Sequence, residues 1–221
     1  MFKLLSKSNA PVIARILLIN VTVLGILHFI SVAIELYAPN HSLVSHTKLF
    51  DLDREHNVPT FYSGILLLTI GFTAWNLRLK AKYFSRKIFW TGLTLFFTYW
   101  AIDEVLVLHE RLAKPIREVL QIGYDSVFYH AWVLVALGLI SLLGIFILIY
   151  YHFKMPSLTK KQGNLLIVIF IFMLGIVLLE ILGTKIYGNP QLYRFGMVPL
   201  EELFEIGMGS YLLIKLLHYR D

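Results

Sequence analysis

Four ionisable side chains fall close together at the end of a long apolar stretch, namely Asp103, Glu104, His109 and Glu110. Carboxylate and imidazole groups without sulfur suit zinc, manganese or non-haem iron. A divalent metal held by them could activate water for hydrolysis, with a free carboxylate as general base. An ionised carboxylate in hydrocarbon costs roughly 2.5–3.5 kcal/mol on insertion scales. These side chains therefore need partners, and a metal ion would supply one.

Acids and histidines in other apolar stretches are expected to reach the same depth. At about 1.5 Å per residue, Asp103, Glu180 and Glu205 each lie roughly 10 Å below one membrane interface. Glu180 and Glu104 are the predicted catalytic groups. The predicted metal ligands are Asp103, His109, Glu110, His130, Glu201 and Glu205.

Helical geometry predicts the direction in which each of these side chains points. At about 100° per residue in one continuous helix, Asp103 and Glu110 share a face, while Glu104 and His109 turn toward adjacent helices. Asp103 and Glu110 are therefore the expected inward pair. Pro199 and the acids after it are typical of a helix start, so favourable interaction with the helix dipole is one explanation for Glu201 and Glu202. The same explanation does not reach Glu205, which lies one turn deeper.

Seven further residues are expected to form a lid or to support the site from behind. One alternative concerns the acidic loop that contains Asp51, Asp53 and Glu55. This loop would then be solvated and would only cap the helix predicted over 58–77, because Asn57 and Pro59 predict a helix start there. Another is that the histidine of the first helix is a core residue bonded to a neighbouring helix. The seven residues are His28, Glu35, Asp51, Asp53, Glu55, His56 and Glu202.

Composition places the chain among membrane proteins. It has 221 residues, of which 57% are hydrophobic, and a mean hydropathy of +0.70, far above that of a soluble domain. It has no cysteine, which excludes disulfides, thiolate zinc sites, iron–sulfur clusters and covalently attached c-type haem. The net charge of +6 comes from residues in short loops, so it indicates membrane topology and not nucleic-acid binding.

Six stretches are long and apolar enough to span a membrane as helices. Short loops join them, so consecutive helices are expected to pack as antiparallel neighbours in one all-α domain over residues 1–221. The first stretch is too long for a signal peptide and is expected to be retained. The stretches cover residues 12–37, 58–77, 88–110, 127–151, 164–186 and 198–217.

Lysine and arginine set the expected orientation. With both termini in the cytoplasm, thirteen of the 20 basic residues face the cytoplasm and seven face outward, as the positive-inside rule requires. On the same map, Asp221 is the one cytoplasmic acid among 14. The sequence therefore predicts a multi-pass protein of the inner or plasma membrane, with its acidic site on the extracytoplasmic side.

The acidic motifs resemble those of a widespread family of uncharacterised bacterial membrane proteins with six helices. The resemblance is carried by Asp51-x-Asp53-x-Glu55-x-Asn57-Val58-Pro59-Thr60, by Asp103-Glu104-x-x-x-Leu108-His109-Glu110 and by Glu201-Glu202. It implies a six-helix membrane fold and no particular activity. Alkaline ceramidase-type hydrolases are an analogy, since they also hold His, Asp and a metal in a helical membrane bundle. Their paired histidines on the last helix are glutamates here.

Four functions remain open at this stage. The first is a metal-dependent hydrolase or di-metal oxidase whose partner is a membrane lipid or lipid-linked substrate. The second is a proton or cation pathway, against which the inner halves of the helices carry almost no ionisable groups. The third is a b-type haem protein with His28, His109 or His130 as axial ligand. The last is a non-catalytic membrane protein that binds a partner through its acidic outer face.

Overall fold

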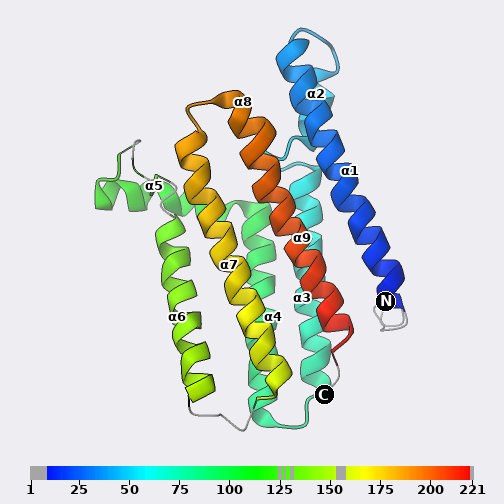
Figure 1. Ribbon diagram of the computed structural model, residues 1–221, viewed down its shortest axis with the longest axis vertical. Coiled ribbons are helices and arrows are strands. Elements are labelled where there is room, and N and C mark those ends of the chain that lie inside the picture. The colour runs from blue at the N-terminus through cyan, green and yellow to red at the C-terminus, as the bar shows by residue number, and fades with distance from the viewer. Residues whose placement is uncertain (1–8, 124–125, 127, 130–131, 153–157, 220–221) are drawn as a thin grey trace.

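The computed structural model describes residues 9–123, 126, 128–129, 132–152 and 158–219, and every regular element in them is helical (Figure 1). Six elements are long helices that run through the molecule, and the others are short or connect them. In chain order the elements are α1 (Ala10–Tyr37), α2 (Val44–Thr47), η2 (Lys48–Phe50), α3 (Val58–Lys80), α4 (Phe84–Leu106), α5 (Leu108–Leu120), α6 (Trp132–His152), α7 (Lys160–Ile186), α8 (Pro190–Leu192), η3 (Tyr193–Met197) and α9 (Val198–Leu217).

Four of these helices are long and apolar enough to cross a membrane, namely α1, α3, α6 and α7. A fifth span results if α4 and α5 are counted together, although they meet at an angle of 80°. The last helix, α9, has the bounds that the sequence predicts, but it carries three glutamates and Lys215. The described chain thus supports four or five membrane spans by length and composition, where the sequence predicts six.

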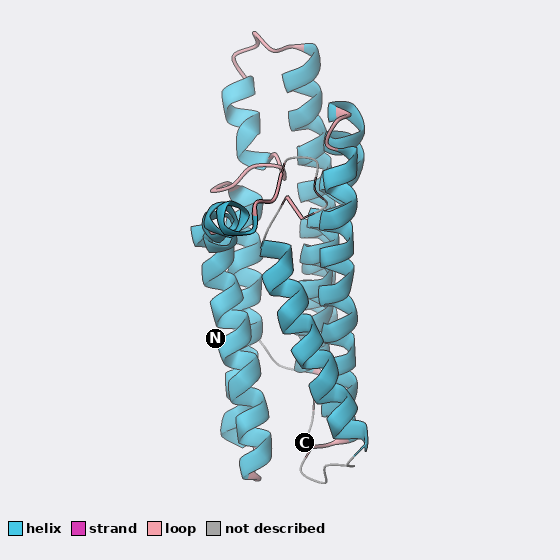
Figure 2. Cartoon of the chain, turned by 90° about the vertical axis from the view of Figure 1, so that its left-hand side faces the viewer, coloured by secondary structure: helices cyan, strands magenta, loops and turns pink. Residues whose placement is uncertain are grey.

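The long helices run side by side in an elongated bundle (Figures 1 and 2). α3 packs against α4 and α9, and α9 also packs against α1 and α7. α6 packs on the outside of α7. The exception is α5, which projects sideways in Figure 1 and is seen end-on in Figure 2. It lies at the level where α4 ends and α6 begins.

Glycines let α3 and α4 approach each other closely. A Cβ atom added at Gly64 would lie 2.7 Å from Val105 Cγ2, and one at Gly71 would lie 3.3 Å from the Thr94 carbonyl oxygen. Small residues at a helix interface let the two backbones approach closely and pack well. The tight α3–α4 contact therefore fixes the position of α4, which carries Asp103 and Glu104.

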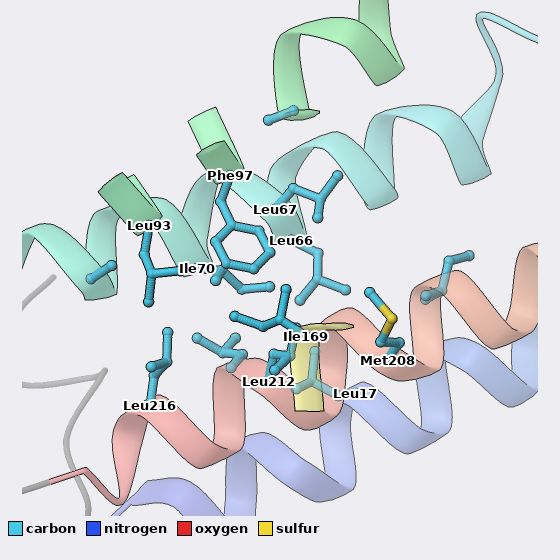
Figure 3. Close-up of a cluster of buried hydrophobic side chains, with 14 of the residues drawn as sticks. Leu17, Leu66, Leu67, Ile70, Leu93, Phe97, Ile169, Met208, Leu212 and Leu216 are labelled. Atoms are coloured by element: carbon cyan, nitrogen blue, oxygen red, sulfur yellow. The ribbon is translucent and has the colours of Figure 1, made fainter. Parts of the chain in front are cut away.

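The interior between α3, α4, α7 and α9 is filled by apolar side chains (Figure 3). Ile70, Phe97 and Leu212 are each no more than 1% exposed. The labelled side chains of Figure 3 also include Leu66, Leu93, Ile169 and Leu216, which face one another from these helices. This part of the bundle is a solid apolar core, and the ionisable side chains lie toward the end that carries α5.

Local signals fix where α3 and α7 begin. The side chain of Asn57 accepts hydrogen bonds from the backbone N–H and the hydroxyl of Thr60, both at 2.9 Å, and Pro59 lies in the first turn. This confirms the helix start predicted from Asn57 and Pro59. α7 starts four residues earlier than predicted, because Thr159 and Gln162 form a capping box.

Candidate functional site

The site begins at a break in the predicted helix over 88–110. Val107 adopts a left-handed backbone conformation with φ 54° and ψ 43°, so α4 ends at Leu106 and α5 leaves at 80°. The expectation of one continuous helix to Glu110 is therefore wrong. A β-branched residue at positive φ is an outlier, and backbone strain of this kind clusters at functional sites.

The break brings Asp103 and His109 together. Asp103 Oδ1 accepts the backbone N–H of His109 at 2.9 Å, and Oδ2 lies 2.9 Å from His109 Nδ1. Because an ionised carboxylate can only accept, Nδ1 carries the proton and Nε2 remains for other chemistry. The edge of the His109 ring also lies against Trp132. The expected pairing of Asp103 with Glu110 is wrong, because the turn at Val107 leaves Glu110 exposed at the surface.

Asp103 and His109 line a cavity of about 200 Å³ between α4, α5, α6, α7, α9 and the segment before α3. Its walls differ in character. On α4 and α7 the lining side chains are apolar or aromatic as far as Trp100 and Val177 and acidic beyond them, so one end of the cavity is acidic. The carboxylates that line it are Glu55, Asp103, Glu104, Glu180, Glu201, Glu202 and Glu205, and the apolar wall includes Phe96, Val135, Leu139, Ile140, Met173 and Val177. Such a cavity suits an amphipathic ligand.

Three of the cavity's acids come from α9, and one of them differs from expectation. Glu201 and Glu205 line the cavity as predicted, but so does Glu202, which was attributed to a free helix start. The short α8 and the π-helix η3 run directly into α9, so Glu202 does not lie at an isolated helix N-terminus. The helix-dipole explanation fails for it, and Glu202 belongs with the other cavity acids.

The cavity's acids outnumber its bases. Among the described residues, His109 and Arg54 are the basic side chains that line it, and Arg54 already bonds to Glu35 and Asp51. Carboxylates that share a cavity repel one another unless protons or a cation neutralise them. In the loop at the mouth, burial and then the charge of Glu110 raise the pKa of Glu55. The described lining therefore supplies more negative than positive side chains.

A ready-made metal shell is not present in the part of the chain that the structure describes. No three His, Asp or Glu side chains there are placed as ligands of one ion. His130, one of the predicted ligands, lies outside the described residues. Six of the predicted ligand and catalytic residues line the cavity. They are Asp103, Glu104, His109, Glu180, Glu201 and Glu205.

A second charged cluster lies beside the cavity, and we call it the clasp: His28, Glu35, Asp51, Arg54 and Arg194. Arg194 Nη2 lies 2.7 Å from Glu35 Oε2 and 2.6 Å from Asp51 Oδ2. Arg54 bonds to the same two carboxylates at 3.1 and 3.2 Å. The clasp ties α1, the loop before α3 and η3 together, so these residues have a structural role and lie outside the cavity, Arg54 excepted.

Asp51 and His28 are fully buried in the clasp. Burial acts to raise the pKa of Asp51, but hydrogen bonding to His28 and the charge of Arg194 outweigh it and lower the pKa to about 2. His28 Nε2 lies 2.9 Å from the Arg194 carbonyl oxygen, and Nδ1 lies 3.1 Å from Leu52 N. With both ring nitrogens occupied, His28 fits the expected core histidine and not an axial haem ligand.

Two predicted lid residues lie at the edge of these clusters. Asp53 Oδ2 is 3.9 Å from Arg194 Nε, and His56 is an exposed loop residue with φ 57°.

The sequence did not single out Arg194 and Trp132. A signal for Arg194 was available, because an arginine among buried acids needs a carboxylate partner. Trp132 is the first residue of α6, and its contact with His109 depends on the turn at Val107.

Comparison with known families assigns the chain to one of them. It belongs to the family described as "Domain of unknown function (DUF8692)", whose model matches residues 14–219. No curated protein and no solved structure matches the chain.

Proposed function

We propose that the protein is a membrane-embedded, metal-dependent enzyme, of the hydrolase type, that acts on a lipid or lipid-like substrate. The observation that carries the proposal is the Asp103–His109 pair at the acidic end of an amphipathic cavity. Asp103 holds the imidazole by its Nδ1–H, which is how carboxylates orient metal-binding histidines. His109 Nε2 and the carboxylates of Glu201, Glu202 and Glu205 are the proposed ligands.

The proposed chemistry assigns roles to the remaining cavity groups. A bound divalent ion such as zinc, manganese or iron would lower the pKa of a coordinated water. Glu104 and Glu180 line the same cavity and are the proposed bases for its proton. In the hydrolysis of an ester or amide, the base that takes the proton from water would return it to the leaving group, so Glu104 or Glu180 would serve first as base and then as acid. The apolar wall would hold the acyl chain.

A proton or cation pathway has less support than the enzyme. The lining of the cavity continues into the apolar core, because Ile176 belongs to both, and Ile70, Phe97 and Leu212 are buried in that core (Figure 3). A pathway would need polar groups on both sides of that core.

We also propose that both termini are cytoplasmic and that the cavity faces the outside of the cell. Cysteines introduced at Ser42 and Gln191 should then label from outside, and one at Ser85 should not.

Metal analysis of the detergent-purified protein tests the proposed function. Wild type should contain divalent metal in amounts comparable with the protein. His109→Ala and Glu205→Gln should lose most of it. Glu118→Gln, on the exposed part of α5, is the matched control and should keep it. A metal-free wild type that does not take up added zinc, manganese or iron would overturn the proposal, as would equal loss in all three variants.

A further inference from the structure

The cavity has an apolar opening on one side of the bundle. Four of its lining side chains are about half exposed, namely Tyr99 at 55%, Leu112 at 49%, Val135 at 49% and Leu139 at 51%. They come from α4, α5 and α6, and none of them is charged, whereas the exposed lining residues of the loop before α3, Arg54 and Glu55, are charged. In an aqueous channel, an exposed rim would be expected to carry polar side chains. This rim matches the hydrocarbon that surrounds a membrane-spanning helix instead.

The packing of α6 explains why this side is open. Among the described residues, α6 packs along α7 and touches α5, and no comparable packing joins it to α4. Figure 1 shows α6 on the edge of the bundle, with α7 beside it. Side chains of α4 and of α6 therefore bound the opening on its two sides. α5 lies across the end of this opening.

The helix α5 has the composition of a helix that lies in a membrane interface. It meets α4 at 80°, and Leu112, Val119 and Leu120 are exposed. Glu110, Arg111, Lys114 and Glu118 are also exposed and fall on the opposite side of the helix by their spacing. An amphipathic helix perpendicular to membrane spans, at the level where they end, buries its apolar face among the lipid headgroups and upper acyl chains.

We propose that the cavity receives a membrane lipid sideways, between α4 and α6, with α5 lying in the interface along the edge of the opening. The acyl chain would lie against Val135, Leu139 and Met173, and the polar end of the lipid would meet the Asp103–His109 pair. The occupant is thus a lipid of the surrounding leaflet and not a water-soluble compound. The proposal names the substrate class of the proposed enzyme and in that respect rests on it, but the route can be tested without activity.

A photoactivatable lipid tests the route. The purified protein is placed in phosphatidylcholine vesicles that contain phosphatidylcholine with a diazirine in its acyl chain, irradiated, and analysed by peptide mass spectrometry. Wild type should carry adducts on the α7 peptide around Met173 and Ile176, which line the cavity. Leu139→Trp should lose most of these adducts, because the indole fills the opening. Leu142→Trp is the matched control, since Leu142 is 64% exposed on α6 but does not line the cavity, and should keep them.

A second variant and a second probe keep the test decisive. Val135→Trp narrows the same opening from one turn away and should act like Leu139→Trp, which guards against a folding defect in one variant. Undiminished adducts in both variants, or no cavity adducts in wild type, would overturn the lateral route. So would labelling of the same peptide by a water-soluble diazirine alone. Metal content separates the two proposals, because these variants should keep their metal if the enzyme proposal holds.

Discussion

The clasp and the cavity lie at the same end of the bundle, and both concentrate carboxylates. In the clasp, Glu35 and Asp51 share Arg54 and Arg194 at distances of 2.6–3.2 Å. In the cavity, seven carboxylates face His109 and the already engaged Arg54. The clasp thus neutralises its own acids within the chain, while the cavity leaves most of its acids to be neutralised by protons or by a cation from outside.

This difference separates charge that holds the fold from charge that is available to a ligand. Removing one partner from a buried, paired cluster leaves an uncompensated charge and destabilises the protein. Removing one carboxylate from a group of like charges relieves repulsion instead. The same type of substitution should therefore have opposite effects on stability in the two regions.

The largest effect is expected from Arg194→Ala in the clasp. It leaves Glu35 with Arg54, and the fully buried Asp51 with Arg54 and His28. We therefore expect a loss of about 3 kcal/mol in the free energy of unfolding, at the lower end of the range for breaking buried pairs. Thermal unfolding in detergent measures it. Arg111→Ala removes an exposed arginine and should change stability little. Equal stability of the two variants would contradict the structural role of the clasp.

The next effect is a loss of stability in acid that depends on Asp51. Its pKa is lowered from 3.8 to about 2 in the folded protein, so the carboxylate stabilises the fold above pH 4 and the stabilisation is lost as the pH falls from about 4 to about 2. This lowering of the Asp51 pKa corresponds to a contribution of about 2 kcal/mol to the free energy of unfolding. Asp51→Asn should be less stable at neutral pH and should show less change across this range. A wild-type curve that stays flat there would refute the prediction.

A smaller effect is expected from Asp103→Asn, which sharpens the comparison at the cavity. The substitution keeps the size of the side chain but removes the carboxylate that orients His109. Loss of such a supporting carboxylate typically weakens metal affinity about 10- to 100-fold, so metal titration should show a shift of that order with little change in thermal stability. If metal binding is unchanged while the protein unfolds earlier, the Asp103–His109 pair belongs with the clasp as a structural contact.

The smallest effect is expected from Glu202→Gln. Because this side chain lies among like charges, neutralising it should raise the free energy of unfolding of the metal-free protein by about 1 kcal/mol, and metal content should fall. Thermal unfolding with and without a chelator measures both. Glu110→Gln, at an exposed position outside the cavity, is the control and should change neither. Destabilisation of the metal-free protein by Glu202→Gln would show that Glu202 has a paired partner, as in the clasp.

The sequence by itself determined the helical elements and the gathering of acids at one end. Long apolar stretches have few alternatives to helix in a membrane, and Asn57 with Pro59 fixed the start of α3 through local hydrogen bonds. The depth of Asp103, Glu180 and Glu205 along their helices follows from the rise per residue. These features depend on neighbours in the chain, and the sequence contains those neighbours.

Only the tertiary structure decided which acids are paired and which face the cavity. The turn at Val107 has no glycine or proline to mark it, and it reverses the expected roles of His109 and Glu110. Arg194 reaches Asp51 across 143 residues, and Glu202 of α9 lines the cavity together with acids of α4 and α7. Helical periodicity assumes an unbroken helix and contains no information on contacts between distant segments. The division between clasp and cavity depends on the break at Val107 and on contacts between distant segments. It therefore appears only when the helices are packed together.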